Sequence, residues 1–207
     1  MKKIFLVVVF AQSVSFAQNS NSSFDTDLGE NQSVFIKNQK FDRDGVELYS
    51  SNLDLKNHKQ LGLGLMIGGA VGLVGINAEI NVEPTEAAVA GIGFGSGYNS
   101  FNLGWKHNFI GNYLSPYTKV GYSKWFNTTG GSNSASNSDI LERVLSEQEI
   151  KDNRFSADFL MGSFGLEYNQ LEGELSGVNL FGELAMMAEI NKGLLIPTGA
   201  VGIIYYY

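Results

Sequence analysis

The chain has 207 residues, with 14 Lys and Arg against 21 Asp and Glu, a formal net charge of −7 and no Cys. This length fits one domain with a short appendage. The lack of Cys excludes disulfides, thiol nucleophiles and thiolate metal sites, and only 2 His argue against a His-built metal site. The acidic balance excludes a general attraction to nucleic acid, so no nucleic-acid partner is expected.

The first segment has the three parts of a secretory signal peptide in their usual order. Residues 2–3 are lysines, and residues 4–11 form an apolar run that is too short to span a bilayer. Small residues, Ser15 and Ala17, then precede the expected cleavage site. We therefore predict that residues 1–17 direct export in a Gram-negative bacterium and are removed, although a buried N-terminal strand is an alternative for the same residues.

Residues 18–60 are expected to form a periplasmic linker that is mostly disordered and largely irregular. Its first part, residues 18–32, is rich in Ser and Asn and has few large apolar residues. An Asp-Gly pair at 44–45 lies between two short apolar runs, which predicts a short hairpin. The same turn has the beginning of a calcium loop without its later ligands, so no metal site is assigned there.

From residue 61 onward, charges become sparse and polar and apolar residues alternate. In residues 74–82 the even positions are apolar and the odd positions are Gly, Asn or Glu, which predicts a strand with one wet and one apolar face. The alternation changes phase at 161–163, which predicts a bulge. The lengths meet or approach the roughly nine to eleven residues of a tilted membrane strand. The expected strands are 61–69, 73–83, 87–96, 99–109, 116–127, 154–168, 177–190 and 195–207.

Residues 61–78 also allow a different structure. This segment carries no charge, and its glycines at 64, 68 and 72 have the small-residue spacing of packed membrane helices. A glycine-rich membrane helix is therefore the alternative to the first two strands.

The last expected strand alternates apolar and aromatic residues, and it resembles the final strand of bacterial outer-membrane β-barrels. Those strands end on an aromatic residue that the barrel assembly machinery recognises. Residues 61–207 are most similar to the small eight-stranded class, the OmpA membrane domain and OmpX. The resemblance implies an all-β fold, a closed eight-stranded antiparallel up-and-down transmembrane barrel, in contact with outer-membrane lipid. It implies an assembly signal at Val201, Ile203, Tyr205 and Tyr207.

The interior of such a barrel is only wide enough for side chains. An unpaired carboxylate in the interior would be costly, so the inward lysines are expected to pair with nearby Glu. We therefore predict a filled lumen. Its polar network is predicted to comprise Glu79, Glu83, Lys106, Lys119, Glu167, Glu183 and Glu189.

These features favour a structural or adhesive protein of the cell envelope, located in the outer membrane, over an enzyme. Residues 127–153 are expected to form one long extracellular loop with a short amphipathic helix, the surface on which an extracellular partner would bind. The alternative function is a small pore or transporter for a narrow solute. No catalytic, cofactor or metal residues are assigned, since no phosphate loop, HExxH or GxSxG motif occurs.

A lipid-modifying barrel enzyme is a third hypothesis. Barrel deacylases, a family of similar architecture, use a His with a nearby Ser and a Glu. Here His107 has no Ser two residues later and is expected near the periplasmic end, away from the outer leaflet. Since nucleophilic hydrolysis needs a base within reach of a nucleophile, this hypothesis ranks below the other two.

Overall fold

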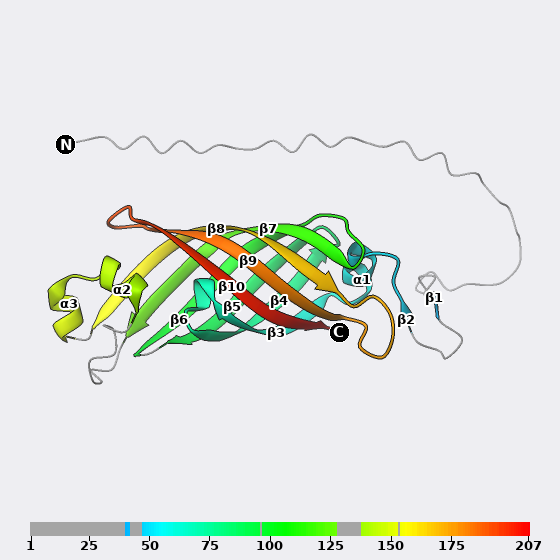
Figure 1. Ribbon diagram of the computed structural model, residues 1–207, viewed down its shortest axis with the longest axis horizontal. Helices are drawn as coiled ribbons and strands as arrows, with labels where there is room; N and C mark the ends of the chain where they lie inside the picture. Colours follow the sequence, from blue (N-terminus) through cyan, green and yellow to red (C-terminus); the bar gives the residue numbers. More distant parts are fainter. Residues whose placement is uncertain (1–39, 42–46, 96, 128–137, 153) are drawn as a thin grey trace, which may run out of the picture. The chain divides into compact units, whose positions relative to one another are not determined.

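The structure is a computed structural model that describes residues 40–41, 47–95, 97–127, 138–152 and 154–207. The predicted signal peptide lies outside the described residues. Eight strands close into one antiparallel barrel in the order β10-β3-β4-β5-β6-β7-β8-β9 (Figure 1). The barrel strands are β3 (Leu61–Gly68), β4 (Val74–Glu83), β5 (Glu86–Gly95), β6 (Tyr98–Asn108), β7 (Leu114–Asn127), β8 (Phe155–Asn169), β9 (Val178–Glu189) and β10 (Leu195–Tyr206). The predicted all-β, up-and-down barrel fold is confirmed.

Shorter elements lie between and before these strands. The 3-10 helix η1 (Gly69–Val71) connects β3 to β4, while α2 (Asp139–Val144) and α3 (Glu147–Asp152) connect β7 to β8. Before the barrel, β1 (Lys40–Phe41) pairs antiparallel with β2 (Glu47–Leu48), in the part of the chain for which a hairpin is predicted. The segment 18–60, expected to be a mostly disordered linker, also contains the helix α1 (Asn52–His58).

Side chains of each barrel strand alternate between the lumen and the outer wall, and most of the buried charged and amide side chains face the lumen. In β4, Asn77 and Glu79 are buried in the lumen, whereas Ile76 and Ile80 are about half exposed on the outer wall. Large exposed apolar side chains occur on the outer face of every barrel strand. A closed barrel with such a wall satisfies all its backbone groups internally and is suited to cross a bilayer.

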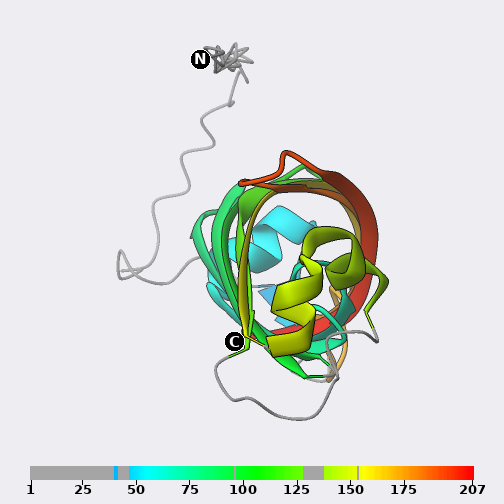
Figure 2. The same ribbon diagram turned by 90° about the vertical axis from the view of Figure 1, so that its left-hand side faces the viewer.

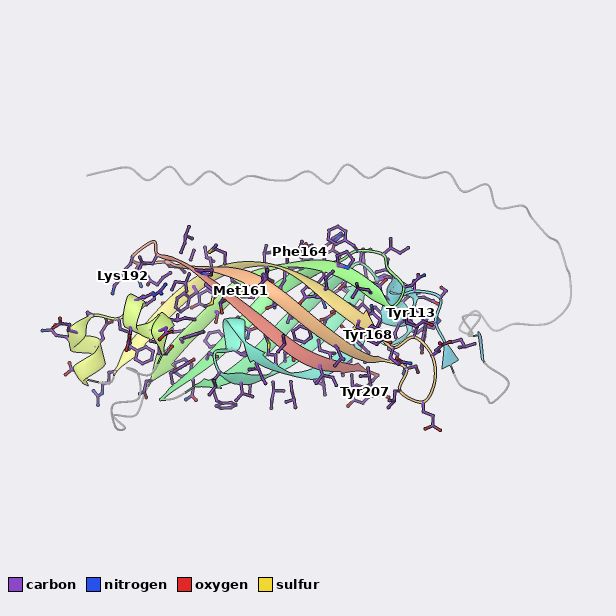
Figure 3. All side chains as sticks on the ribbon, viewed as in Figure 1. Tyr113, Met161, Phe164, Tyr168, Lys192 and Tyr207 are labelled. Carbon is purple, nitrogen blue, oxygen red and sulfur yellow. The ribbon has the colours of Figure 1, made fainter. Side chains whose placement is uncertain are left out.

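Aromatic side chains gather on the outer wall at the end of the barrel where α1 lies. Tyr113, Tyr168 and Tyr207 are labelled at this end in Figure 3, and all three are exposed. The rings of Tyr113 and Tyr168 stack with centroids 6.4 Å apart. Rings at this level match the aromatic girdle of transmembrane barrels, whose rings lie at the membrane–water interface.

The structure decides two of the local predictions. Residues 61–78 form β3, η1 and the beginning of β4, so the helix alternative was wrong. Among the described residues, no helix is long and apolar enough to cross a bilayer. The bulge at 161–163 was also wrong, because β8 pairs with both neighbours in unbroken register. In β8 the apolar side chain of Met161 is buried and Gly162 lies on the exposed face. An apolar residue on the buried face and a small residue on the outer face look like a change of phase in the sequence. An irregularity lies instead in the β4–β5 pair, between Asn81 and Glu83.

The connection η1 folds into the barrel rather than away from it. Ala70 and Val71 are buried, and the flanking Gly68 and Gly72 have φ of 85° and 86°, a region that favours glycine. The Ser100 hydroxyl donates to the carbonyl of Val71 at 2.7 Å. The Ser123 hydroxyl and the Trp125 indole N–H donate to the carbonyl of Ala70, at 2.8 and 2.9 Å. These bonds satisfy buried carbonyls that the strands do not pair.

Gly93 of β5 provides the space for η1. A Cβ atom at Gly93 would lie 2.0 Å from the carbonyl oxygen of Val71, a backbone atom that cannot move without displacing η1. We expect Gly93→Ala to lower the free energy of unfolding by about 1–3 kcal/mol, measured by urea titration of the folded barrel. The matched control is Gly162→Ala, since nothing lies within 4 Å of a Cβ there. Equal effects of the two substitutions would contradict this account.

Candidate functional site

The helix α1 closes the barrel end where β3 begins and β10 ends (Figure 1). Its N-cap is Ser51, whose hydroxyl accepts from the N–H of Asp54 at 3.2 Å. The next residue, Asn52, is fully buried and holds the β6–β7 turn. Its side-chain amide donates to the carbonyl of Phe109 and accepts from the N–H of Gly111, both at 2.9 Å. The helix is therefore fixed to the barrel at its first residue.

The residues on either side of α1 are also bonded to the barrel. Before the helix, the backbone N–H of Tyr49 donates to the carbonyl of Leu171 in the β8–β9 turn at 3.0 Å. After it, the carbonyl of Gln60 accepts from the N–H of Asn81 at 2.8 Å. The segment 49–60 is thus bonded to the barrel, although it belongs to the residues 18–60 for which the sequence predicts a mostly disordered linker.

Helix α1 places one lysine inside the lumen. Lys56 is fully buried, and its Nζ donates to Glu167 Oε2 at 2.7 Å and to Asn108 Oδ1 at 2.6 Å. Glu79 Oε1 lies 3.5 Å from the same nitrogen. On the opposite side, Lys106 Nζ donates to Glu79 Oε2 at 2.8 Å and also to Glu167. Lys56, Glu79, Lys106 and Glu167 form an ion-pair ring in which the charges alternate and sum to zero.

Two tyrosines complete the surroundings of this ion-pair ring. The hydroxyl of Tyr206 donates to Glu79 Oε1 at 2.8 Å, and its ring centroid lies 5.4 Å from Lys56 Nζ. The ring centroid of Tyr117 lies 4.4 Å from Lys106 Nζ. Both lysines therefore have an aromatic face as well as carboxylates beside them, an arrangement that favours a desolvated cation.

A second ion pair lies further along the lumen. Lys119 Nζ is 2.8 and 2.7 Å from the two carboxylate oxygens of Glu183, and the Tyr117 hydroxyl donates to the same carboxylate at 3.0 Å. A cavity of about 20 Å³ separates this pair from the ion-pair ring and is lined by Asn77 and Asn102, among others. That volume holds about one water molecule. The middle of the lumen is filled by side chains.

The other end of the barrel is closed by α2 and η1. In Figure 2, where this end faces the viewer, α2 and α3 lie in front of the ring of strands. Leu141 and Val144 of α2 are buried in an apolar cluster with Phe159 and Met187 of the barrel wall. In the same cluster, Trp125 stacks on Tyr98 with ring centroids 4.8 Å apart. The lumen is thus closed by charged contacts at the α1 end and by apolar contacts at the α2 end.

Helix α3 begins with a capping box. The N–H and hydroxyl of Ser146 donate to Glu149 Oε2 at 2.8 and 2.7 Å, and the Glu149 N–H donates back to the hydroxyl at 3.4 Å. Hydrogen bonds from Ser146 to the ionised carboxylate hold the pKa of Glu149 below its ordinary value. These contacts fix the turn between α2 and α3.

Six of the seven predicted lumen residues are buried, and they fall into three groups. Glu79, Lys106 and Glu167 belong to the ion-pair ring, Lys119 and Glu183 form the second pair, and Glu189 lies near the α2 end. The carboxylate of Glu189 accepts from the backbone N–H of Lys192. Lys192, labelled near α2 in Figure 3, donates through its ammonium to the carbonyl of Val144.

Glu83 is a correction to the predicted network. Its side chain is exposed at the rim of the barrel, opposite Glu86 in register, because the β4–β5 irregularity interrupts the inward alternation just before it. The prediction also missed Lys56, the most deeply buried lysine among those whose burial the structure describes. Ser51 followed by Asp54 resembles a helix start and was the one signal in the sequence for α1.

His107 lies on the outer wall and outside the lumen. Its Nδ1 is 2.6 Å from Glu86 Oε1, and the Trp105 indole N–H donates to the other oxygen of this carboxylate at 2.5 Å. Thr118 is opposite His107 in register, but no hydrogen bond joins the two side chains in the described structure. Within the same described ranges, no group of three His, Asp or Glu side chains could hold a metal ion.

Eight antiparallel strands, an apolar outer wall and a lumen filled by paired charges are now established. This is the architecture of a small transmembrane β-barrel. No family model matches the chain, and no curated protein matches it. The chain resembles the N-terminal β-barrel domain of Pseudomonas aeruginosa OprF at 15% identity and a TM-score of 0.47, covering 70% of this chain and 96% of that one. It also resembles the Yersinia pestis outer membrane protein Ail, determined in a phospholipid bilayer nanodisc, at 11% identity and a TM-score of 0.39, covering 72% and 99%.

Proposed function

We propose that the protein is a structural or adhesive barrel of the bacterial outer membrane and that it does not conduct solutes. The obstructed lumen is the observation that carries this proposal. The ion-pair ring and α1 occupy one end, and the apolar cluster under α2 occupies the other, beside a pocket of about 290 Å³ lined by Gly69, Tyr98 and Trp125, among others. The cavity between the two ion pairs, about 20 Å³ among the described residues, holds about one water molecule. To cross the barrel, a solute would have to displace α1 and the apolar cluster under α2, and it would have to separate the buried ion pairs.

The two ends of the barrel can be given sides in the membrane. In outer-membrane barrels the turns facing the periplasm are short and the loops facing the exterior are longer. The α1 end carries the short β4–β5 and β6–β7 turns, while the α2 end carries the long β7–β8 connection. We therefore assign α1 to the periplasm and the 127–153 loop to the cell exterior, where the exposed side of α2 and α3 is the surface for an extracellular partner.

The last strand is proposed as the signal for the barrel assembly machinery. Val201, Ile203, Tyr205 and Tyr207 all face outward along β10 and its end. This strand closes the barrel by pairing with β3. Before β10 pairs with β3, this outward row of apolar and aromatic side chains is accessible to another protein. This accessibility supports recognition of β10 by the assembly machinery before the barrel closes.

We propose no catalytic role for the protein. Glu86 and His107 form a polar pair beside Trp105 on the outer wall, with part of each side chain exposed. Such a group suits the membrane–water interface, where amphipathic rings lie at the level of the lipid headgroups.

Planar-bilayer recording separates the structural proposal from the pore alternative. We expect no stable conductance steps from the purified protein, because side chains of the described residues fill the middle of the lumen. Glu79→Gln and Lys106→Met serve as companion variants, since a pore gated by the lumen charges would change its step size in them. Discrete steps in the unmodified protein that shift in either variant would overturn the proposal in favour of a transporter or pore.

A further inference from the structure

The ammonium group of Lys56 lies in a site that the barrel itself builds. Its three nearest acceptors are Glu167, Asn108 and Glu79, at 2.7, 2.6 and 3.5 Å, and they come from three different barrel strands. The ring of Tyr206 provides a fourth side. All four groups are buried. The barrel contributes the whole binding surface, and α1 contributes the cation.

The barrel residues of this site carry one more negative charge than positive charge, and the Lys56 ammonium balances it. Without Lys56, the carboxylates of Glu79 and Glu167 would face the single ammonium of Lys106, which leaves one buried negative charge uncompensated. A buried carboxylate in this position is strongly unfavourable. The site is therefore one cation short, at the point where the Lys56 nitrogen lies.

The geometry also selects the type of cation. An ammonium has three N–H donors, which matches three acceptors around one nitrogen. The aromatic face of Tyr206 adds a cation–π contact. A planar guanidinium would need its acceptors in a flat fork, and a quaternary ammonium has no donors at all.

We propose that the α1 end of the barrel is a binding site for a primary alkylammonium group, which Lys56 occupies as a tethered ligand. The site binds an ammonium on an unbranched alkyl stem and stays occupied as long as α1 is in place. This inference goes beyond the proposed structural role, and the conductance experiment does not depend on it.

Chemical rescue tests the proposal in the full-length chain. Lys56→Ala removes three carbons and the nitrogen, the atoms of n-propylammonium. In SDS gels a folded barrel runs as a band separate from that of the heat-unfolded chain. We expect the variant to change from the folded to the unfolded band at a lower temperature than the unmodified protein. Adding n-propylammonium chloride should raise that temperature saturably, at roughly millimolar concentrations, the range that a ligand of four heavy atoms reaches.

Three comparisons show whether the rescue is specific. At equal concentration, n-propanol and tetramethylammonium chloride should give no rescue, because the first lacks the charge and the second lacks the donors. The unmodified protein should not respond, since Lys56 fills its site. Lys56→Met should not respond either, because its side chain occupies the stem space.

The outcomes are decisive in both directions. If Lys56→Ala folds and n-propylammonium leaves its transition unchanged, or if propanol rescues it equally, the ammonium site is refuted. If the variant does not fold alone, the readout becomes its refolding yield with each additive. A yield that only n-propylammonium restores supports the site, and a yield that none or all of the additives restore overturns it.

Discussion

Replacing Lys56 with Met is expected to lower the free energy of unfolding by about 3–5 kcal/mol, the usual cost of removing one partner from a buried ion pair. The methionine keeps most of the stem's volume, so the loss reports the missing charge. Glu79 and Glu167 would then share Lys106 alone, with both carboxylates buried. Urea titration of the refolded barrel in one lipid or detergent system measures the loss.

The matched control is Lys124→Met. Lys124 forms an ion pair with Asp158 at 3.2 Å, but the two side chains are 34% and 27% exposed. Pairs of this kind contribute at most about 1 kcal/mol. If the two substitutions cost the same, the ion-pair ring does not have the energetic role assigned to it.

The second large effect is expected at the opposite end of the barrel. Trp125→Ala should lower the free energy of unfolding by about 3–5 kcal/mol, the range for removing a buried large aromatic side chain. Trp125 is 1% exposed, stacks on Tyr98, contacts Phe159 edge-to-face, and donates to the carbonyl of Ala70. Its removal therefore leaves a cavity in the apolar cluster and takes away one of the two donors to the buried carbonyl of Ala70, the Ser123 hydroxyl being the other.

Trp105 provides the control for this substitution, because it is the other tryptophan of the chain and is 45% exposed on the outer wall. Trp105→Ala should change the urea midpoint much less than Trp125→Ala does. Near-ultraviolet circular dichroism of the folded state gives a second measurement, since only Trp125 is held in a rigid aromatic stack. Loss of the aromatic signal in the Trp105 variant and its retention in the Trp125 variant would contradict this assignment.

Alternation of residue types made the barrel predictable from sequence. In 74–82 the polar and apolar faces separate cleanly, and the structure has β4 at 74–83. The other strand boundaries agree within about two residues, because Gly, Pro and Asn mark the turns. The bulge predicted at 161–163 is absent because the strand alternates without interruption there: apolar Met161 lies on the buried face and Gly162 on the exposed one.

The partners inside the lumen were less predictable. Alternation shows that Lys106 and Glu167 point inward, but only the register and the curvature of the barrel bring strands β6 and β8 close enough for an ion pair. Glu83 was misassigned because one irregularity ends the alternation locally. Lys56 was missed because a helix of seven residues has too little periodicity to stand out, and its burial depends on a barrel that forms around it.

Tyr206 connects two regions that are distant in sequence. It belongs to the closing strand β10, opposite Gly62 of β3, and its side chain contacts both Glu79 and Lys56. The hydroxyl that steadies the buried carboxylate thus arrives with the final segment of the barrel to be synthesised. A chain that lacked this segment would keep Glu79 beside its two lysines but without the tyrosine hydroxyl, so the polar network of the lumen is completed only when the last strand pairs with the first.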